Sequence, residues 1–391
     1  MEPQSSSLRH SPLQSVHEHL GATLTEFAGW QMPLRYGSET AEHNAVRTAA
    51  GLFDLSHMGE IVLTGPQAGA ALDYALVGQP STLRPGRARY SMICAEDGGV
   101  LDDLIVYRLG DEEFFVVANA SNTGVVAGEL TARAAAFKTE VRDRTADYAL
   151  IAVQGPNAAS ILAPVTDTEL DGVKYYASHT ATICGHPVLL ARTGYTGEDG
   201  FEMFCAPAAA EPLWAGLTAA GQDQGLVPAG LAARDTLRLE AGMPLYGNEL
   251  GRDMTPFDAG LGRVVKLDKP GDFVGRAALA EYAEQPPRRV LAGLACRGRR
   301  VPRHGYAVLW DGQPCGIVTS GAPSPTLGQP IAMAYLDPQT VSVASSEAAN
   351  TDQAGNTGQA GQDGDSRLAI DIRGRGEAAD FVTLPFYSRR H

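Results

Sequence analysis

A carboxylate and a carboxamide on neighbouring strands are the first candidates for chemistry in this chain. The apolar, β-branched stretch over residues 98–119 contains one short polar break, which predicts a β-hairpin. We expect Arg108 to pair with Glu113 across that break. The same register places Asp102 directly opposite Asn119, with Cβ atoms about 5 Å apart on one face of the sheet. Because burying such groups without partners is unfavourable, the pair indicates a site for a polar ligand.

The neighbouring Asp103 is expected to point to the opposite face of the strand. An aspartate that follows two glycines commonly caps local backbone amides, and this is the simpler role for either aspartate. The opposed Asn119 favours a role in chemistry for Asp102 and a capping role for Asp103.

A glycine-rich segment over residues 192–202 is a second candidate. Its glycines recur at every third position, but no Lys–Ser/Thr pair and no helix follow them, so the pattern excludes a phosphate-binding P-loop. A glycine-rich hairpin loop is one interpretation. Tyr195 and Glu202 favour another, because an aromatic ring and a carboxylate together suit a flat heterocycle that carries amino groups.

Residues 230–242 predict a helix that ends at Gly242. Arg234 and Arg238 lie four residues apart on one face of this helix, so their mutual repulsion requires an acidic partner. That partner is either a carboxylate of the protein itself or the carboxylate or ring of a ligand.

The sequence shows no pattern for a metal site or a covalent nucleophile. His57 follows an apolar stretch, where a hydrogen-bonded structural histidine is expected in preference to a general base. No carboxylate or cysteine array completes a metal site with His17 and His19. No Gly-x-Ser-x-Gly motif or Cys/His pair predicts a covalent hydrolase. We therefore expect a reaction without a metal.

The composition narrows the class of protein. The 391 residues suffice for two or three domains, and 44% hydrophobic with 19% charged residues is typical of a globular protein. A formal net charge of −14 argues against binding to nucleic acid or to an anionic membrane. Five scattered cysteines without a CxxC pair indicate a reducing compartment. No signal, transit or membrane-spanning segment is recognised, so a cytoplasmic enzyme is expected.

Two segments of the chain resemble each other. Residues 61–74 and 151–162 each predict a strand, a Gly-Pro turn and a helix, which indicates two related α+β units by duplication, with chance as the alternative. From residue 286 onward, short strand-like runs between turn signals predict a C-terminal β-domain. The polar residues 344–366 predict a solvated, disordered loop that proteases should cut first. The strand-like runs are Val290–Leu294, Tyr306–Trp310, Cys315–Ser320, Ile331–Leu336 and Leu368–Ile372.

A cluster of arginines lies at the start of this β-domain in an otherwise acidic chain. It is either a solvated or interdomain face, or a docking patch for an acidic partner or a polycarboxylate tail. If it docks a partner, Arg299→Glu with Arg300→Glu should weaken the salt-dependent association. The cluster consists of Arg288, Arg289, Arg297, Arg299, Arg300 and Arg303.

Six longer motifs are spread along almost the whole length of the chain: Phe27–Pro33, Gly51–Gly59, Gly98–Tyr107, Arg192–Glu202, Ala233–Asn248 and Thr319–Ala334. In type and order, these motifs resemble the aminomethyltransferase (T-protein) family of the glycine cleavage system. The sequence departs from the family in a longer insertion at residues 344–366, and in Ala118 where the family commonly has valine.

This resemblance implies a three-domain α+β fold. Residues 1–285 are expected to form a folate-binding region of two interleaved α+β units, and residues 286–391 a C-terminal β-barrel domain. It also implies transfer of an aminomethyl carbon from lipoylated H-protein to tetrahydrofolate, with release of ammonia. Asp102 is implied as the catalytic aspartate, because a carboxylate stabilises the positive charge that develops as ammonia leaves. The implied folate contacts are Met58, Tyr90, Asn119, Tyr195, Glu202, Arg234 and Arg389.

Other classes of protein share features with this sequence. Folate-dependent demethylases and sarcosine-type oxidases resemble the same fold, but the long oxidases carry a dinucleotide-binding domain, and no GxGxxG motif follows a strand here. A non-catalytic folate-binding protein is expected to lack much of the set Asp102, Glu202 and Arg234. Release of ammonia from aminomethyl-loaded H-protein, with and without tetrahydrofolate, distinguishes these alternatives.

Overall fold

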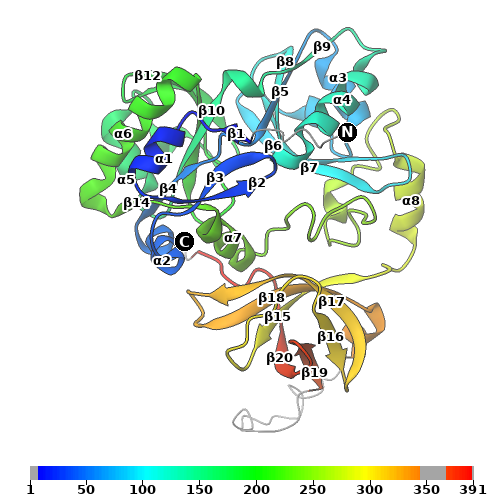
Figure 1. Ribbon diagram of the computed structural model, residues 1–391. Helices are drawn as coiled ribbons and strands as arrows, with labels where there is room; N and C mark the ends of the chain where they lie inside the picture. Colours follow the sequence, from blue (N-terminus) through cyan, green and yellow to red (C-terminus); the bar gives the residue numbers. More distant parts are fainter. Residues whose placement is uncertain (1–7, 344–366, 390–391) are drawn as a thin grey trace, which may run out of the picture.

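The computed structural model describes residues 8–343 and 367–389 (Figure 1). It contains two β-sheets that pack on each other, a small N-terminal sheet and a closed C-terminal barrel. The predicted loop over residues 344–366 lies outside the described residues. Within the described ranges, no helix is both long enough and apolar enough to cross a membrane.

The first unit is a five-stranded antiparallel sheet with two helices on one face. It consists of β5 (Gly59–Thr64), α3 (Ala68–Ala75), β6 (Arg87–Cys94), β7 (Val100–Arg108), β8 (Glu113–Ala118), α4 (Thr123–Ala134) and β9 (Glu140–Asp143). The strand order is β6-β7-β8-β5-β9. The helices bury an aliphatic core that includes Leu72, Val106 and Leu130.

The second unit is a six-stranded sheet with its own pair of helices. It consists of β10 (Ala149–Gln154), α5 (Ala158–Leu162), β11 (Ser178–Ile183), β12 (His186–Ala191), β13 (Gly200–Cys205), α6 (Ala210–Gly221) and β14 (Leu226–Pro228), together with β4 (Ala50–Asp54) from the preceding segment. The strand order is β11-β12-β13-β10-β4-β14. Its helices cover a core that includes Ile161, Phe201 and Trp214.

The two units repeat one arrangement of strands and helices. In each, the first strand leads into a helix, a three-stranded meander follows, and the last strand of the meander pairs with the first strand. The Gly-Pro turns also match, because Gly65 and Gly155 have φ angles of +129° and +136°. A Cβ atom at either glycine would lie within 2.6 Å of a backbone oxygen, so a side chain does not fit. The predicted duplication is therefore confirmed in the topology.

The two sheets pack against each other through their inner faces. Aromatic rings from β8 and β13 meet edge to face, with 5.0 Å between the ring centroids of Phe115 and Phe204. The ring of Tyr107 contacts both, at centroid distances of 6.2 and 5.9 Å. Tyr107 also borders a cavity between the sheets, so this rigid aromatic core forms one wall of the cavity.

The N-terminal segment and a central helix connect the sheets to the barrel. The elements are β1 (Arg9–His10), α1 (Gln14–His19), β2 (Thr23–Phe27), β3 (Trp30–Arg35), α2 (Glu39–Thr48), α7 (Leu231–Glu240) and α8 (Arg276–Glu284). The predicted helix over 230–242 is confirmed as α7, and Gly242 has a φ angle of +65° just after its end. Helix α7 packs on α2 and β3, and also on the barrel, so it lies between the two parts of the molecule (Figure 1).

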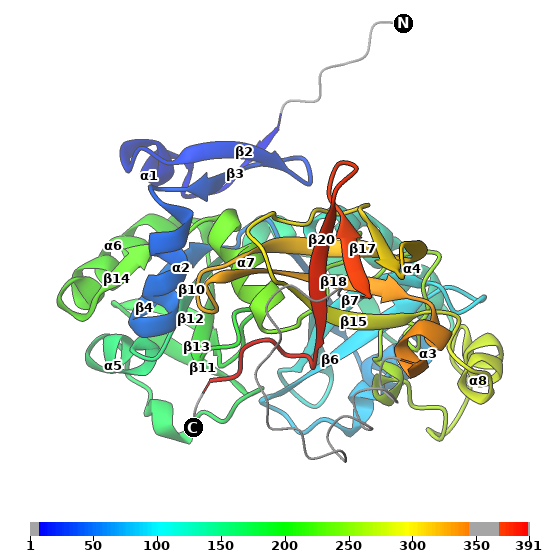
Figure 2. The ribbon, with the colours of Figure 1, turned by 90° about the horizontal axis from the view of Figure 1, so that it is seen from below.

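Six strands close the C-terminal barrel. They are β15 (Val290–Cys296), β16 (Ala307–Trp310), β17 (Gln313–Ser324), β18 (Gln329–Leu336), β19 (Leu368–Asp371) and β20 (Gly376–Val382), in the order β15-β18-β17-β16-β19-β20. The sequence predicted the first five and missed β20, which pairs with β15 and closes the barrel (Figure 2). The predicted division between residues 285 and 286 falls in the connection from α8 to β15, and it stays a prediction.

Most of the predicted arginine cluster is paired with acidic side chains of the fold. The pairs are Arg288–Asp258, Arg289–Asp253, Arg297–Asp380 and Arg300–Glu377, with N–O distances of 2.8, 3.7, 2.7 and 3.6 Å. Two of these pairs connect the residues just before β15 to the segment before α8, which favours the interdomain alternative. The docking patch stays a prediction.

Candidate active site

The β7–β8 hairpin differs by one residue from the predicted register. Arg108 pairs with Phe114 instead of Glu113, because the backbone N–H of Leu109 already bonds the carbonyl of Glu113 at 2.9 Å. A shift of one residue reverses the face on which every side chain lies. The prediction that Asp102 lies opposite Asn119 is therefore wrong, and Asp103 is the aspartate on that face of β7.

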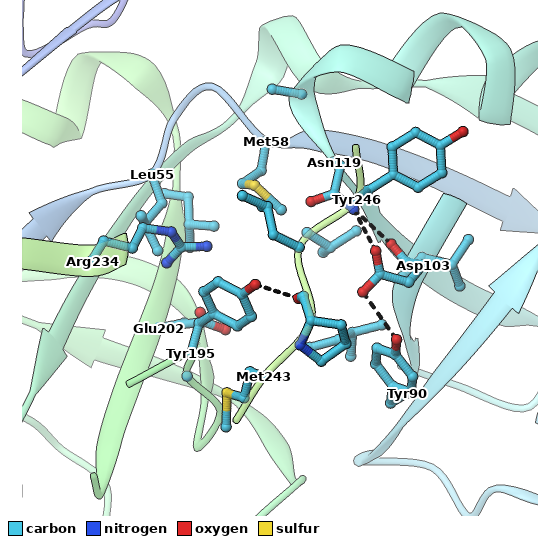
Figure 3. A pocket seen from close by; sticks show the side chains of 18 of the residues that line it. Leu55, Met58, Tyr90, Asp103, Asn119, Tyr195, Glu202, Arg234, Met243 and Tyr246 are labelled. Carbon is cyan, nitrogen blue, oxygen red and sulfur yellow. Dashed lines mark hydrogen bonds between the residues drawn. The ribbon is translucent and has the colours of Figure 1, made fainter. Parts of the chain in front are cut away.

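A cavity of about 400 Å³ lies between the two sheets, beside α7 and the segment that follows it (Figure 3). Asp103 lines it and Asp102 does not. Its size and mostly apolar wall with a few polar groups suit a small organic ligand. The site residues predicted from the sequence that line it are Met58, Tyr90, Asn119, Tyr195, Glu202 and Arg234.

Asp103 is held at one side of the cavity by two hydrogen bonds. The hydroxyl of Tyr90 donates to Oδ2 at 3.0 Å, and Nδ2 of Asn119 donates to Oδ1 at 2.9 Å. Tyr90 comes from β6, which pairs with β7, and Asn119 directly follows β8. Burial raises the pKa of Asp103 to about 6, although both hydrogen bonds act in the opposite direction. The carboxyl group can therefore exchange a proton close to neutral pH.

Asp102 is fully buried behind the wall of the cavity. Its carboxylate accepts hydrogen bonds from the backbone N–H of Asn119 at 3.0 Å, from Nδ2 of Asn119 at 2.9 Å and from Nδ2 of Asn122 at 2.6 Å. Burial, followed by the charge of Asp103, raises the pKa of Asp102 to about 7. Asp102 thus accepts a backbone N–H, but from Asn119 across the hairpin and not from a local turn of the kind that the sequence suggested for Asp103.

The opposite side of the cavity carries a ring, a carboxylate and a guanidinium. Arg234 of α7 lies over the ring of Tyr195, with its Cζ atom 4.8 Å from the ring centroid. Glu202 of β13 accepts hydrogen bonds at Oε2 from Thr193 and, at 3.5 Å, from Tyr107. Burial raises the pKa of Glu202 and lowers the pKa of Arg234. Figure 3 shows Glu202 and Arg234 across the cavity from Asp103.

The two arginines of α7 have different roles. Arg238 is buried, forms ion pairs with Asp235 at 2.7 Å and Glu249 at 3.0 Å, and so has its acidic partners inside the fold. Glu249 also accepts a hydrogen bond from the backbone N–H of Leu245 at 2.9 Å. Through these contacts, Arg238 holds the segment that lines the cavity after α7, whereas Arg234 faces the cavity itself.

Comparisons with known proteins find matches over nearly the whole length of the chain. The GCVT N-terminal domain profile matches residues 13–269, and the glycine cleavage T-protein C-terminal barrel domain profile matches residues 289–388. Aminomethyltransferases of Streptomyces coelicolor and Saccharopolyspora erythraea are both 60% identical to this chain, over 99% and 98% of it and 99% of each relative. The chain belongs to the glycine cleavage T-protein family of aminomethyltransferases.

A solved T-protein has the same fold. The crystal structure of the glycine cleavage system aminomethyltransferase T from Bartonella henselae is 35% identical and has a TM-score of 0.85. The match covers 98% of this chain and 99% of that one. The predicted α+β class, with two related units and a C-terminal barrel, is therefore confirmed.

In this T-protein family member, His57 lines the cavity and is not a hydrogen-bonded structural histidine of the predicted kind. Its Nδ1 atom is buried and has no hydrogen-bond partner among the described residues. Burial, followed by the charge of Arg234, lowers the pKa of His57 to about 3, so the ring is neutral at pH 7. Its ring meets Phe27 edge to face, with 5.4 Å between centroids. His57 therefore contributes a neutral, mostly apolar wall.

Arg389 lies outside the cavity, unlike the other predicted folate contacts. Its guanidinium is 3.5 Å from a carboxylate oxygen of Asp199 and lies over the ring of Tyr175, 5.8 Å from the centroid. Sequence reasoning also missed several residues that line the cavity: Tyr176 lies outside the six motifs, and the others lie in the motif Ala233–Asn248, after the predicted helix, where no role was assigned. These residues are Tyr176, Met243, Pro244, Leu245 and Tyr246.

In the part of the chain that the structure describes, no group of three or more His, Cys, Asp or Glu residues is placed to hold a metal ion. The expectation of a metal-free reaction stays a prediction.

Proposed function

We propose that this T-protein family member transfers the methylene carbon of a lipoyl-bound aminomethyl group on H-protein to tetrahydrofolate, with release of ammonia. The observation that carries the proposal is the polarity of the cavity. Asp103, a titratable carboxylate, lies on one side, and the set Tyr195, Glu202 and Arg234 lies on the other. A flat, amine-rich heterocycle fits this arrangement, with its reacting nitrogens toward Asp103.

The second set suits the pterin ring of the folate. The Oε1 atom of Glu202 has no partner among the described residues, so the carboxylate can accept hydrogen bonds from the ring amino group and the adjacent N–H. Arg234 can donate to the ring carbonyl, and Tyr195 offers an aromatic face. Met58 adds an apolar contact.

The reaction breaks two bonds to the transferred carbon and forms two. As the C–N bond to ammonia breaks, the carbon becomes electrophilic and N5 of the folate attacks it. The C–S bond to the lipoyl arm then breaks, and N10 closes the five-membered ring. The protons lost from N5 and N10 appear in ammonia and in the lipoyl thiol, so no oxidant or reductant is needed.

Asp103 is the catalytic residue that we assign to these steps. Its carboxylate stabilises the positive charge on the carbon and accepts a proton from a folate nitrogen, effects that typically contribute about 10²–10⁴-fold in rate. Tyr90 and Asn119 orient the carboxylate through their hydrogen bonds. Asp102 does not reach the cavity, and we assign it a positioning role through Asn119.

Ammonia release from aminomethyl-loaded H-protein tests the proposal. We expect release that depends on tetrahydrofolate and yields 5,10-methylenetetrahydrofolate. Folate binding without release would indicate a non-catalytic folate-binding protein. Formation of 5-methyltetrahydrofolate from a methylated donor without H-protein would indicate a demethylase.

A further inference from the structure

His57 is a polar residue of the cavity wall that the proposed function does not use. It lies in the turn between β4 and β5, where only 2% of the residue is exposed. The backbone N–H of Met58 closes this turn by donating to the carbonyl of Leu55 at 2.9 Å, and both of these residues also line the cavity. The turn therefore presents His57 to the cavity between two apolar neighbours.

Hydrogen bonds from three parts of the chain hold this turn in place. The carboxylate of Asp54 accepts from the backbone N–H of Ser56 at 2.9 Å, and Oγ of Ser56 accepts from the backbone N–H of Leu150 at 3.1 Å. The other carboxylate oxygen of Asp54 lies 2.8 Å from Nε2 of His17 in α1. A side chain on such a turn is preorganised, so a ligand that binds it pays little for ordering it.

The two ring nitrogens of His57 have different surroundings. Nδ1 is buried without a hydrogen-bond partner. Nε2 also has no partner within the described ranges, but it is not fully buried, so it opens to the cavity. The lowered pKa of His57 keeps the ring neutral at pH 7, and in a neutral imidazole one nitrogen carries the proton while the other accepts. Because buried N–H groups without an acceptor are rarer than buried acceptors without a donor, the proton belongs on Nε2.

Most other side-chain donors of the cavity are already engaged within the protein. The engaged donors belong to Tyr90, Tyr107, Asn119, Tyr195 and Tyr246. Within the described part of the chain, the side chains of four lining residues donate to no protein acceptor: Arg234, His57, Ser121 and Tyr176. Burial and then the charge of Arg234 lower the pKa of His57, so these two side chains lie close together.

Two neighbouring donors match the carbonyl group of a pterin ring. A carbonyl oxygen has two lone pairs, and Arg234 can donate to one of them. The carboxylate of Glu202 cannot serve the second lone pair, because an ionised carboxylate only accepts hydrogen bonds. A lone pair left against an apolar wall is unfavourable. The Nε2–H group of His57, beside Arg234, is the donor that this lone pair requires.

We propose that His57 donates its Nε2–H to the pterin carbonyl of the bound folate and is a further binding residue of the pterin site. This inference rests on the proposed function, because it takes the occupant of the cavity to be a folate. His57 then fixes the ring together with Arg234 and Glu202, and it does not contact the reacting nitrogens on the side of Asp103.

A matched pair of variants tests the inference. His57→Gln places an amide N–H near the position of Nε2, whereas His57→Asn places one near Nδ1 and leaves the position of Nε2 without a donor. Calorimetric titration of the full-length protein with 5-formyltetrahydrofolate should give a Kd that rises about tenfold in His57→Asn and less than about threefold in His57→Gln. The control is His19→Asn, an exposed histidine on α1, which should not alter Kd.

NMR of the unchanged protein provides a measurement that does not depend on the folding of a variant. In protein labelled with ¹⁵N-histidine, the His57 ring should be the Nε2–H tautomer at pH 7, and its Nε2 signal should shift when 5-formyltetrahydrofolate binds. An Nδ1–H tautomer would overturn the inference while leaving folate binding intact. Equal Kd values for His57→Asn and His57→Gln would also overturn it, because the ring would then contribute packing alone. Absence of folate binding by the unchanged protein would overturn the proposed function as well.

Discussion

The Nδ2 atom of Asn119 lies 2.9 Å from a carboxylate oxygen of Asp102 and 2.9 Å from one of Asp103. The two aspartates are adjacent on β7 and point to opposite faces, and a single amide group holds both. This arrangement separates the acid that faces the cavity from the acid that fixes the amide.

Asp103→Asn should lower kcat by about 10²–10⁴-fold with near-normal folate binding, because the shape is kept and the charge is lost. Asp102→Asn should lower protein stability by about 1–3 kcal/mol, since it replaces one of the two acceptor oxygens by an NH2 donor that faces buried N–H groups of Asn119 or Asn122. Steady-state kinetics and urea unfolding of the two variants check this. The assignment is wrong if Asp102→Asn loses more in kcat than Asp103→Asn.

The pH dependence of kcat/KM should follow the acids of the cavity. The pKa of Asp103 is raised to about 6, so its active carboxylate form accumulates as pH rises through that value. Activity should therefore fall as pH decreases below about 6. Because the pKa of Asp102 is raised to about 7, the pair should titrate in two coupled steps. The pH profile of kcat/KM reports the pKa values of the free enzyme. A profile that is flat from pH 5 to 8 would contradict this prediction.

Glu202→Gln should weaken folate binding while largely sparing kcat at saturating folate. The loss of a charge-assisted hydrogen bond corresponds to about 1.5–3 kcal/mol, or roughly 10- to 100-fold in Kd. Equilibrium binding of tetrahydrofolate measures the change. The control is Asp223→Asn, an exposed carboxylate on a turn away from the cavity, which should not alter Kd. An unchanged Kd for Glu202→Gln would remove Glu202 from the proposed pterin contacts.

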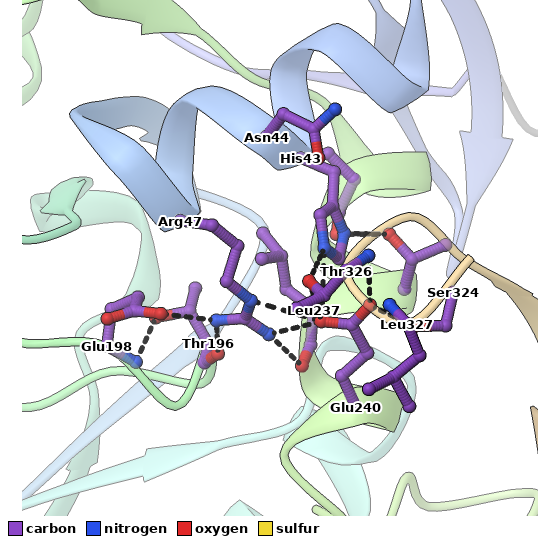
Figure 4. A network of polar contacts seen from close by, with 12 residues as sticks. His43, Asn44, Arg47, Thr196, Glu198, Leu237, Glu240, Ser324, Thr326 and Leu327 are labelled. Atoms are coloured by element: carbon purple, nitrogen blue, oxygen red, sulfur yellow. Dashed lines mark hydrogen bonds and ion pairs between the residues drawn. The ribbon is translucent and has the colours of Figure 1, made fainter. Parts of the chain in front are cut away.

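The buried carboxylate of Glu240 forms one of the contacts between the barrel and the body of the protein (Figure 4). Arg47 pairs with it at 2.9 Å and His43 at 3.1 Å, and the β17–β18 hairpin adds hydrogen bonds from Ser324 and, at 2.7 Å, from Thr326. Burial alone would raise the pKa of Glu240, but these partners outweigh it and lower the pKa to about 2.

Glu240→Gln should therefore reduce the free energy of unfolding by about 1–3 kcal/mol, because Arg47 loses one of its two buried carboxylate partners and keeps only Glu198, at 2.8 Å. Because the pKa is lowered in the folded state, the stabilisation is present above about pH 4.5 and is lost as pH falls toward 2. Urea unfolding at pH 7 and at pH 3 measures both effects. A change below about 0.5 kcal/mol at pH 7 would show that the contact contributes little.

The sequence predicted the strands well where apolar runs alternate with turn signals, as in β15 to β19. It missed β20, since the run Gly376–Val382 has few β-branched residues and is stabilised by closure of the barrel. The pairing register of β7 with β8 could not be predicted from the local sequence either. Both of its faces are buried, with Val106 and Tyr107 each at 0% exposure, so hydrophobic alternation does not reveal which aspartate faces the cavity.

The residues of the candidate site also fall into two groups, those that the sequence identified and those that it did not. Tyr195, Glu202 and Arg234 were identified because each stands in a marked motif, a glycine-rich loop or a helix with paired arginines. Tyr176 stands in none of the motifs, and Tyr246 follows the predicted helix in the motif Ala233–Asn248 without a chemical pattern of its own. They reach the cavity through tertiary packing of segments that are distant in the sequence, and a single chain without its fold does not show that proximity.

The duplicated architecture has a consequence for how activity is distributed along the chain. The first unit supplies the acid, Asp103, with Tyr90 and Asn119, and the second supplies Tyr195 and Glu202. Neither unit holds all of the reactive groups. The two units therefore build one shared site and not two separate sites. A polypeptide severed between β9 and β10 would regain turnover only when both fragments reassociate.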